Sequence, residues 1–239
     1  MLFAKTGPET PDTNINGIAN NPSITLNEFF SSSNTFFNKF ITAGKVNYTA
    51  IKNDSVAIYK LINFIGSADI SASDKNTNTA FYINTYNLLV IKTVIENMPL
   101  TEPTDLPGFF DAKKHAVAGS YMTLNELENK KLRPDPRVHF VLVCAAKSCP
   151  KIINEAYMPD KIQEQLDAQT KIALNDNTFI KIDEKTKTVK ISKLFDWYKD
   201  DFINASGSAI DYINKYRTTA IPATYVVSFY EYDWSLNGF

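Results

Sequence analysis

The chain has 239 residues, of which 44% are hydrophobic, and its 25 lysines and arginines nearly balance 26 acidic residues. This length and apolar content indicate one folded domain with a sizeable core, and they exclude a disordered chain. The basic residues are dispersed, which argues against a nucleic-acid-binding surface, and no apolar run reaches the roughly 20 residues of a membrane span.

A polar segment, residues 1–22, precedes the predicted domain, residues 23–239. The start of the chain has neither the basic residues nor the long apolar run of a secretory signal. The protein is therefore either cytosolic, or exported to a periplasmic or extracellular location with its signal absent from this sequence.

Three helices are expected in the first part of the chain. Aromatic residues three to four positions apart predict a helix over residues 23–40, and a short extended piece at residues 46–48 leads to a second helix over residues 55–65. The longest helix is predicted over residues 79–97, ending before Pro99. This helix is apolar nearly all round, which is typical of a helix buried at the centre of a fold.

The middle of the chain carries clear local signals. Residues 115–121 turn at a Gly-Ser pair and predict a hairpin. Thr123 and Glu126 have the spacing of a capping box, so a short helix is expected to begin there and to end before Pro134. Residues 138–143 are the most strand-like run in the chain.

The last part of the chain alternates helices and strands. A helix is predicted over residues 159–174, a hairpin over residues 179–191, two helices over residues 194–216 and a final strand over residues 225–230. The whole pattern indicates an α+β fold. In this single domain, the buried helix at residues 79–97 packs on a small, mainly antiparallel sheet.

Four segments carry a family resemblance: residues 81–87, 123–133, 135–150 and 194–202. Together they resemble the domain-of-unknown-function family 547, an uncharacterised family found in exported bacterial proteins and, beside other domains, in plant and animal proteins. The resemblance implies no agreed activity. The family usually has a histidine directly after the glutamate of the second segment, where this chain has Asn129.

The enzymatic hypothesis is a thiol-dependent hydrolase or acyl transferase. His139 and His115 are the two histidines of the chain, and an extended strand would place His139 and Cys144 on opposite faces, about 16 Å apart. Cys149 lies beyond a loop that can fold back over the strand. Cys149 is thus the candidate nucleophile and His139 the base. Glu128, Asn84 or Asn87 could orient the imidazole, and the hypothesis carries Glu128 in this role. On this reading Cys144 is buried and Cys149 is the more reactive thiol.

The alternative is a noncatalytic ligand- or protein-binding module in which Cys144 and Cys149 form a structural pair. A bond between the two sulfurs would remove the nucleophile and favour this alternative. Trp197, Tyr198 and Trp234 are candidates for the wall of a carbohydrate or peptide groove, although aromatic residues at helical spacing more often fill cores.

A polar network is predicted around the central helix. Asn84 and Asn87 share one face of it and form either a latch on loop backbone or the wall of a pocket. We expect Arg137 in the same region. The sequence has neither zinc-ligand spacing nor a glycine-rich phosphate loop, so no metal or cofactor is expected, and the small-molecule or peptide ligand is not identified.

Overall fold

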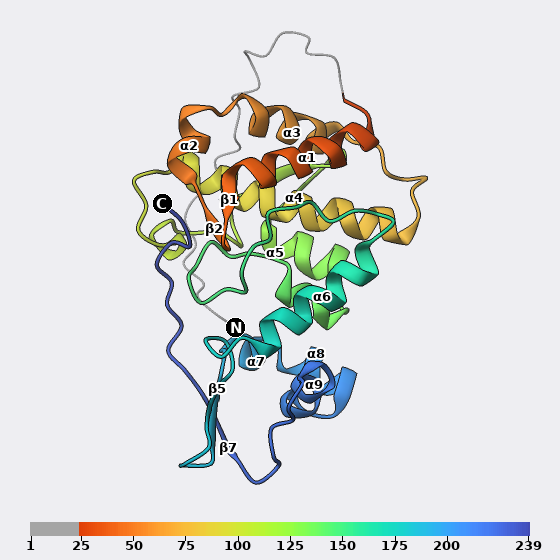
Figure 1. Cartoon of the computed structure of the whole chain (residues 1–239). Helices are drawn as coiled ribbons and strands as arrows, with labels where there is room; N and C mark the ends of the chain where they lie inside the picture. The colour runs from red at the N-terminus through yellow and green to blue at the C-terminus, as the bar shows by residue number, and fades with distance from the viewer. Residues whose placement is uncertain (1–23) are drawn as a thin grey trace.

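Helices dominate residues 24–239, the part of the chain that the computed structural model describes (Figure 1). The α-helices are α1 (Leu26–Phe40), α2 (Tyr48–Asn53), α3 (Val56–Ser67), α4 (Lys75–Glu96), α5 (Leu124–Leu127), α6 (Ile162–Asn175), α7 (Leu194–Trp197), α8 (Lys199–Ser206) and α9 (Ala209–Tyr216). Two 3-10 helices, η1 and η3, and one π-helix, η2, cover Pro103–Asp105, Pro136–Phe140 and Glu128–Leu132, respectively. The strands are β1 (Ile41–Thr42), β2 (Lys45–Val46), β3 (His115–Val117), β4 (Ser120–Met122), β5 (Lys181–Asp183), β6 (Thr188–Ile191) and β7 (Val226–Phe229).

Within the described residues, the strands form three small sheets. β1 pairs with β2 and β3 with β4, both antiparallel, while β6 pairs antiparallel with β5 and parallel with β7. Ala118 and Gly119 join β3 to β4 with positive φ angles at both residues, the combination that a tight hairpin turn requires. The predicted α+β class and both predicted hairpins are confirmed.

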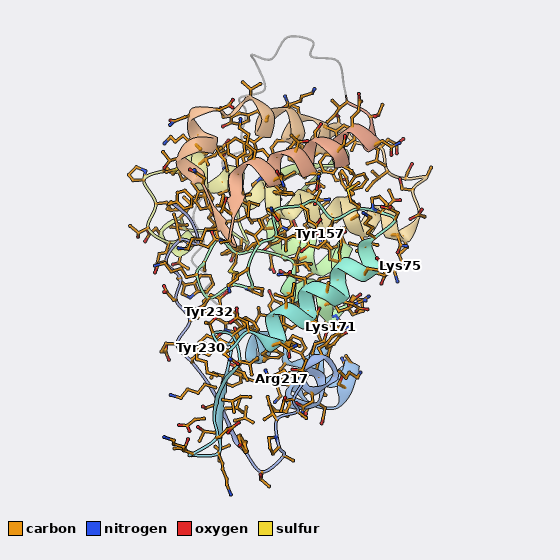
Figure 2. All side chains as sticks on the ribbon, viewed as in Figure 1. Lys75, Tyr157, Lys171, Arg217, Tyr230 and Tyr232 are labelled. Carbon is orange, nitrogen blue, oxygen red and sulfur yellow. A yellow bond between two sulfur atoms is a disulfide. The ribbon has the colours of Figure 1, made fainter. Side chains whose placement is uncertain are left out.

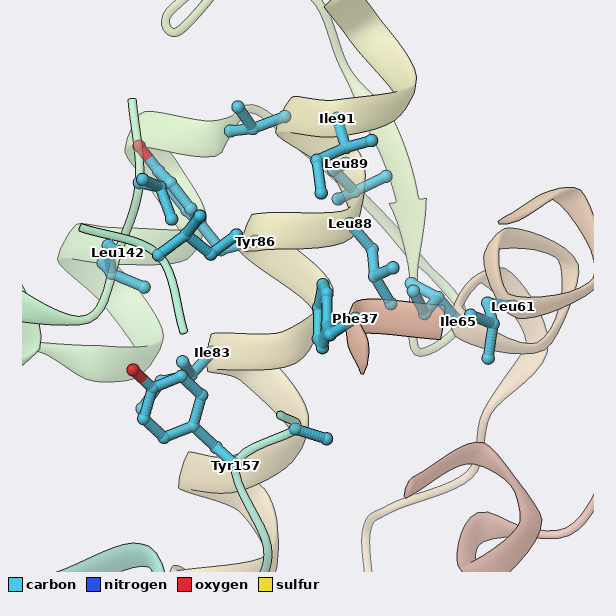
Figure 3. Close-up of a cluster of buried hydrophobic side chains, with 14 of the residues drawn as sticks. Phe37, Leu61, Ile65, Ile83, Tyr86, Leu88, Leu89, Ile91, Leu142 and Tyr157 are labelled. Atoms are coloured by element: carbon cyan, nitrogen blue, oxygen red, sulfur yellow. The ribbon is translucent and has the colours of Figure 1, made fainter. Parts of the chain in front are cut away.

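The central helix α4 is buried along most of its length and lies among α2, α3, α5, α6 and η2. Figure 3 shows Phe37 of α1 and Ile65 of α3 on the side of α4 that carries Leu88, with Tyr157 and Leu142 on the other side. Each such buried apolar side chain contributes about 1.5–3 kcal/mol. The neighbours of this helix are therefore mainly other helices, with the small sheets at the periphery.

A second group of buried side chains fills the other end of the molecule, around Phe195, Phe202 and Tyr212. It lies between α6, α8, α9 and the sheet of β5, β6 and β7, at the lower end of Figure 1. The helix η3 sits at the junction, because its Val138 belongs to the first group and its Phe140 to the second. His139 is thereby held between the two groups.

The strand predicted over residues 138–143 is wrong. This segment begins as η3, where the Asp135 carboxylate accepts a hydrogen bond from the Arg137 backbone N–H at 3.0 Å and Pro136 occupies the first turn. An Asp-Pro pair is a helix start signal, and the apolar run that follows is buried against two cores rather than on one face of a sheet. The alternation of faces and the distance of about 16 Å that were inferred from a strand geometry therefore do not apply.

The segment after β7 runs back across the molecule to the first sheet, as the dark blue trace in Figure 1 shows. The Asn237 N–H donates to the Ala145 carbonyl at 2.9 Å, and the Phe239 N–H donates to the Val46 carbonyl at 3.0 Å. Gly238 forms a bridge with Val46, so close that a Cβ at this position would lie 2.1 Å from the Val46 carbonyl oxygen. This segment also covers the loop that holds both cysteines.

Two further expectations from the sequence concern the N-terminal segment and membrane-spanning helices. The polar segment of residues 1–22 lies outside the described residues, and the domain boundary at residue 23 stays a prediction. Within residues 24–239, none of the helices combines the length and the apolar character needed to traverse a membrane.

Candidate functional site

A cavity of about 140 Å³ opens between α4, η2, η3, α7 and the segment after β7. Its aromatic lining consists of Tyr86, Phe110, Trp197, Tyr198, Tyr232 and Trp234. Its polar and sulfur-bearing lining consists of Asn125, Glu128, His139, Cys144 and Cys149. A cavity needs a volume on the order of 10–15 Å³ to hold one water molecule, so this cavity has room for a small molecule.

On one side, His139 is held by Asp201 of α8. His139 Nε2 lies 2.7 Å from Asp201 Oδ2, and the imidazole is 3% exposed. Arg133 completes the contact, because its Nε and one terminal nitrogen bind the two oxygens of Asp201 at 2.8 and 2.7 Å. Burial opposes the charge of Asp201, but the hydrogen bonds from His139 and Arg133 outweigh it and lower the pKa of Asp201 to about 2.

On its other side, His139 faces Glu128 of η2, with His139 Nδ1 and Glu128 Oε1 3.3 Å apart. The imidazole stacks on Tyr198, with the ring centroids 3.8 Å apart. Burial works against the charged imidazole, but hydrogen bonding and attraction from Asp201 and Glu128 prevail and raise the pKa of His139. The arrangement therefore favours an imidazolium between two carboxylates.

Local sequence explains how Glu128 reaches this position. The predicted capping box is confirmed, because the Thr123 hydroxyl accepts from the Glu126 N–H at 3.1 Å and the Glu126 carboxylate accepts from the Thr123 N–H at 3.0 Å. The box fixes the start of α5, and η2 follows without a break from Glu128. A π-type turn at this point is typical of helices that carry functional residues.

The two cysteines are bonded to each other. Cys149 is 8% exposed and Cys144 is half-buried, the reverse of the predicted order, because no strand sets their orientation. Cys149 Sγ accepts from the Cys144 N–H at 3.0 Å and from the Tyr232 hydroxyl at 3.2 Å. A bonded pair provides no free thiol, so the alternative of a structural cysteine pair is better supported than the thiol-dependent enzyme.

Three aromatic rings form one wall of the cavity. The ring centroids of Trp197 and Tyr232 are 4.9 Å apart, those of Tyr232 and Trp234 are 4.7 Å apart, and those of Trp197 and Trp234 are 5.7 Å apart. Figure 2 labels Tyr232 on the segment that follows β7. Tyr198 lines the same cavity, and Trp197 and Trp234 are the two tryptophans of the chain. The aromatic residues singled out in the sequence thus meet in one place.

Asn84 and Asn87 hold loop backbone and are not part of the described cavity lining. The Asn84 amide donates to the Tyr157 carbonyl at 2.7 Å and accepts from the Tyr157 N–H at 3.0 Å. The Asn87 amide donates to the Val141 carbonyl and accepts from the Val143 N–H, both at 3.0 Å. Each buried amide therefore satisfies its donor and acceptor by fixing a loop on α4.

Arg137 also lies apart from the described cavity lining, although it precedes His139 by two positions. Its guanidinium binds Asp135 at 2.7 Å and Asp167 of α6 at 2.9 Å. The hydrogen bonds that the guanidinium donates to Asp135 and Asp167 raise the pKa of Arg137 further above its usual value. Its contacts therefore join η3 to α6.

The charged groups of the site compensate one another. Arg133 pairs with Asp201, and His139 stands between Asp201 and Glu128. His139 Nε2 contacts Asp201, whereas Nδ1 lies 3.3 Å from Glu128 Oε1 and has no hydrogen-bond partner among the described residues. Because the two cysteines are bonded to each other, there is no free thiol on which His139 could act as a base. Among residues 24–239, no three His, Cys, Asp or Glu side chains form a group that could hold a metal ion.

Asp201 and Arg133 were not among the predicted site residues. Both lie within the segments that carry the family resemblance, but they are 68 positions apart, and nothing in the local pattern pairs them. An acidic residue on a short helix is usually on the solvent-exposed face. Asp201 is buried instead, because its partners Arg133 and His139 come from elements far away in the chain.

The family model described as "Protein of unknown function, DUF547" matches residues 70–172. The chain is similar to this family over a stretch that contains α4, Glu128, His139 and both cysteines. Asp201 and the two tryptophans lie beyond it. No curated protein and no solved structure matched the chain.

Proposed function

We propose that the chain is a noncatalytic binding module whose cavity takes a small, uncharged ligand with an apolar face and hydroxyl groups, such as a sugar ring. The observation that carries this proposal is the composition of the cavity wall: a cluster of aromatic rings beside an acid and an imidazole that neutralise each other. Small-molecule sites typically combine a largely apolar, aromatic wall with a few fixed polar groups.

The charge balance argues for an uncharged ligand. An anion would approach the Glu128 carboxylate, and an organic cation would approach the imidazolium of His139, within the same small cavity. Either charge would have to displace one partner of a buried pair, which is costly. A neutral molecule leaves the pair intact.

The hydroxyl groups of the wall argue for a ligand that both donates and accepts hydrogen bonds. Burial raises the pKa of Tyr86, Tyr198 and Tyr232, so their hydroxyls stay protonated. The Tyr232 hydroxyl already contacts the sulfurs of Cys144 and Cys149, which leaves its oxygen to accept from a ligand, while the Tyr86 hydroxyl can both donate and accept. The faces of Trp197 and Trp234 suit the apolar face of a ring. A sugar ring offers both surfaces.

Tryptophan fluorescence tests the proposal directly, because both tryptophans of the chain line the cavity. The full oxidised chain is titrated with methyl glucoside and N-acetylglucosamine, and separately with tetramethylammonium and acetate. We expect a saturable change in emission with at least one of the sugars and none with the two ions. A response confined to either ion, or none to any of the four compounds, would contradict the proposal.

A pair of variants ties the signal to the cavity. Trp197→Ala removes one ring of the wall and should weaken sugar binding, with Trp234 still reporting the emission. Tyr121→Ala removes an aromatic side chain of β4 that is 66% exposed and lies outside the described cavity lining, so it should bind like the parent. Equal loss in both variants would mean that the signal does not arise from the cavity.

A further inference from the structure

The disulfide lies at the edge of the first group of buried residues, where both of its cysteines also line the cavity. Both Cys144 and Cys149 belong to the cavity lining, and the Cys144 side chain is the more exposed of the two. A small molecule that enters the cavity can therefore contact the sulfur–sulfur bond. Thiol–disulfide exchange depends on such access and on how well the departing sulfur carries negative charge.

The two sulfurs differ in their hydrogen-bond donors. Cys149 Sγ is contacted by the Cys144 backbone N–H at 3.0 Å and by the Tyr232 hydroxyl at 3.2 Å. Cys144 Sγ shares the Tyr232 hydroxyl, at 3.1 Å. The backbone donor thus favours negative charge on Cys149, because a hydrogen bond to a charged acceptor is stronger than one to a neutral acceptor.

We propose that this disulfide exchanges with small thiols that enter the cavity, with Cys144 as the sulfur attacked and Cys149 as the sulfur released. The thiolate of the incoming molecule forms a bond to Cys144 Sγ as the Cys144–Cys149 bond breaks, and the electron pair of that bond goes to Cys149 Sγ. The products are a mixed disulfide on Cys144 and a Cys149 thiolate held by the Cys144 N–H and the Tyr232 hydroxyl.

A second thiolate completes the exchange. It attacks the sulfur of the small molecule in the mixed disulfide, forms a bond to it and releases Cys144 as a thiolate. Two thiols are oxidised to one disulfide, the protein disulfide is reduced to two thiols, and the two protons of the incoming thiols end on Cys144 and Cys149 or in solvent. This activity goes beyond the proposed ligand binding and does not depend on it.

The regiochemistry can be read with 2-mercaptoethanol as the probe, a small thiol without other charged groups. The folded, oxidised chain is incubated with 2-mercaptoethanol, quenched with acid, tagged with N-ethylmaleimide and cleaved after lysine. Cleavage at Lys147 places Cys144 and Cys149 on separate peptides. We expect the mercaptoethanol adduct on the Cys144 peptide and the maleimide on the Cys149 peptide.

Two outcomes would overturn the proposal. One is a folded chain that gives no adduct under conditions in which the urea-unfolded chain reacts, since this would mean that the cavity does not admit the thiol. The other is the mercaptoethanol adduct mainly on the Cys149 peptide, which would contradict the assignment of the leaving sulfur.

A matched pair of tyrosine variants tests the role of the donor. Tyr232→Phe keeps the ring of the aromatic wall but removes the hydroxyl, and we expect exchange to slow by about tenfold, the factor for about 1.4 kcal/mol. Tyr157→Phe alters another buried tyrosine, which is outside the described cavity lining, and should exchange at the parent rate. Equal rates for Tyr232→Phe and the parent would remove the hydroxyl from the mechanism, and circular dichroism checks that both variants fold.

Discussion

Asp201 and His139, 62 positions apart in the chain, meet through Oδ2 and Nε2 at 2.7 Å. The contact joins α8, which packs in the second group of buried residues, to η3, which lies between both groups. Because both side chains are buried, the protonation of this pair is coupled to the stability of the fold.

The pair predicts a stability maximum in mildly acidic solution. The pKa of His139 is raised above 6.5, so its contribution is complete below pH 6.5 and is lost as the pH rises through the raised value. The pKa of Asp201 is lowered to about 2, so its contribution is complete above its unfolded value of 3.8 and is lost as the pH falls toward 2. Asp201→Asn should therefore lose most stability between these limits, by about 3 kcal/mol.

Denaturant titrations from pH 4 to pH 9 measure this effect. Asp200→Asn changes the neighbouring, exposed carboxylate and should follow the parent curve. The difference between Asp201→Asn and the parent should shrink above pH 6.5, as His139 loses its proton. A constant difference over the whole range would show that the imidazole is not charged in the folded protein.

The other histidine predicts the opposite behaviour. His115 is buried in β3, and its Nε2 has no hydrogen-bond partner among the described residues. Burial, with a smaller effect of the nearby lysines, lowers the pKa of His115 to about 3. The pKa of His115 in the unfolded chain, 6.5, is higher. The contribution of neutral His115 to stability is therefore fully present above pH 6.5 and is lost as the pH falls toward 3.

His115→Phe should remove this acid sensitivity. Its unfolding free energy, measured with urea at pH 7, 5.5 and 4, should fall less on acidification than that of the parent. Tyr121→Phe, on the paired strand β4, is the control, and its unfolding free energy should fall on acidification as much as that of the parent. Parallel curves for His115→Phe and the parent would mean that His115 accepts a proton in the folded state without cost.

The amide of Asn87 predicts a stability loss on truncation. Asn87→Ala removes both hydrogen bonds to the loop at Val141 and Val143 and leaves a buried carbonyl and a buried N–H without a partner, at a cost of about 1–3 kcal/mol. Asn154→Ala removes an exposed amide and should be neutral. The midpoint of denaturant unfolding separates the two cases. An unchanged midpoint for Asn87→Ala would mean that its hydrogen bonds to Val141 and Val143 do not stabilise the fold.

The capping box of α5 predicts coupled effects. Thr123→Ala should cost about 1 kcal/mol, because the first turn of the helix loses the hydroxyl that accepts from the Glu126 N–H. Glu126→Ala removes the reciprocal bond. In a double-mutant cycle, the double variant should lose less stability than the sum of the single variants. Strict additivity would mean that the two bonds do not act as one box.

The sequence could predict those elements whose signals are local. The capping box at Thr123, the Gly119 hairpin and the apolar helix before Pro99 each rest on a few neighbouring residues, and the structure has all three. The prediction of a strand over residues 138–143 was wrong, because a segment buried against two cores has the same apolar sequence as a buried strand.

The site was predictable only in part, for a related reason. His139, Glu128 and the cysteines were singled out by their chemistry, and all of them line one cavity. Asp201 reaches His139 through packing between distant elements, which no spacing along the chain encodes. The covalent state of the two sulfurs likewise depends on how the loop between them folds, so their separation of five positions left it open.

The return of the chain to β2 has a consequence for how the molecule folds. Tyr48 donates through its hydroxyl to Asn237 Oδ1 at 2.7 Å, across 189 positions, and Gly238 packs against Val46. Contacts of such high sequence separation require the closure of a very long loop and slow the folding of a domain. Until residues 237–239 are in place, β2 lacks the bridge to Gly238 and Tyr48 lacks its acceptor on Asn237, so the first sheet is completed only by the last residues of the fold.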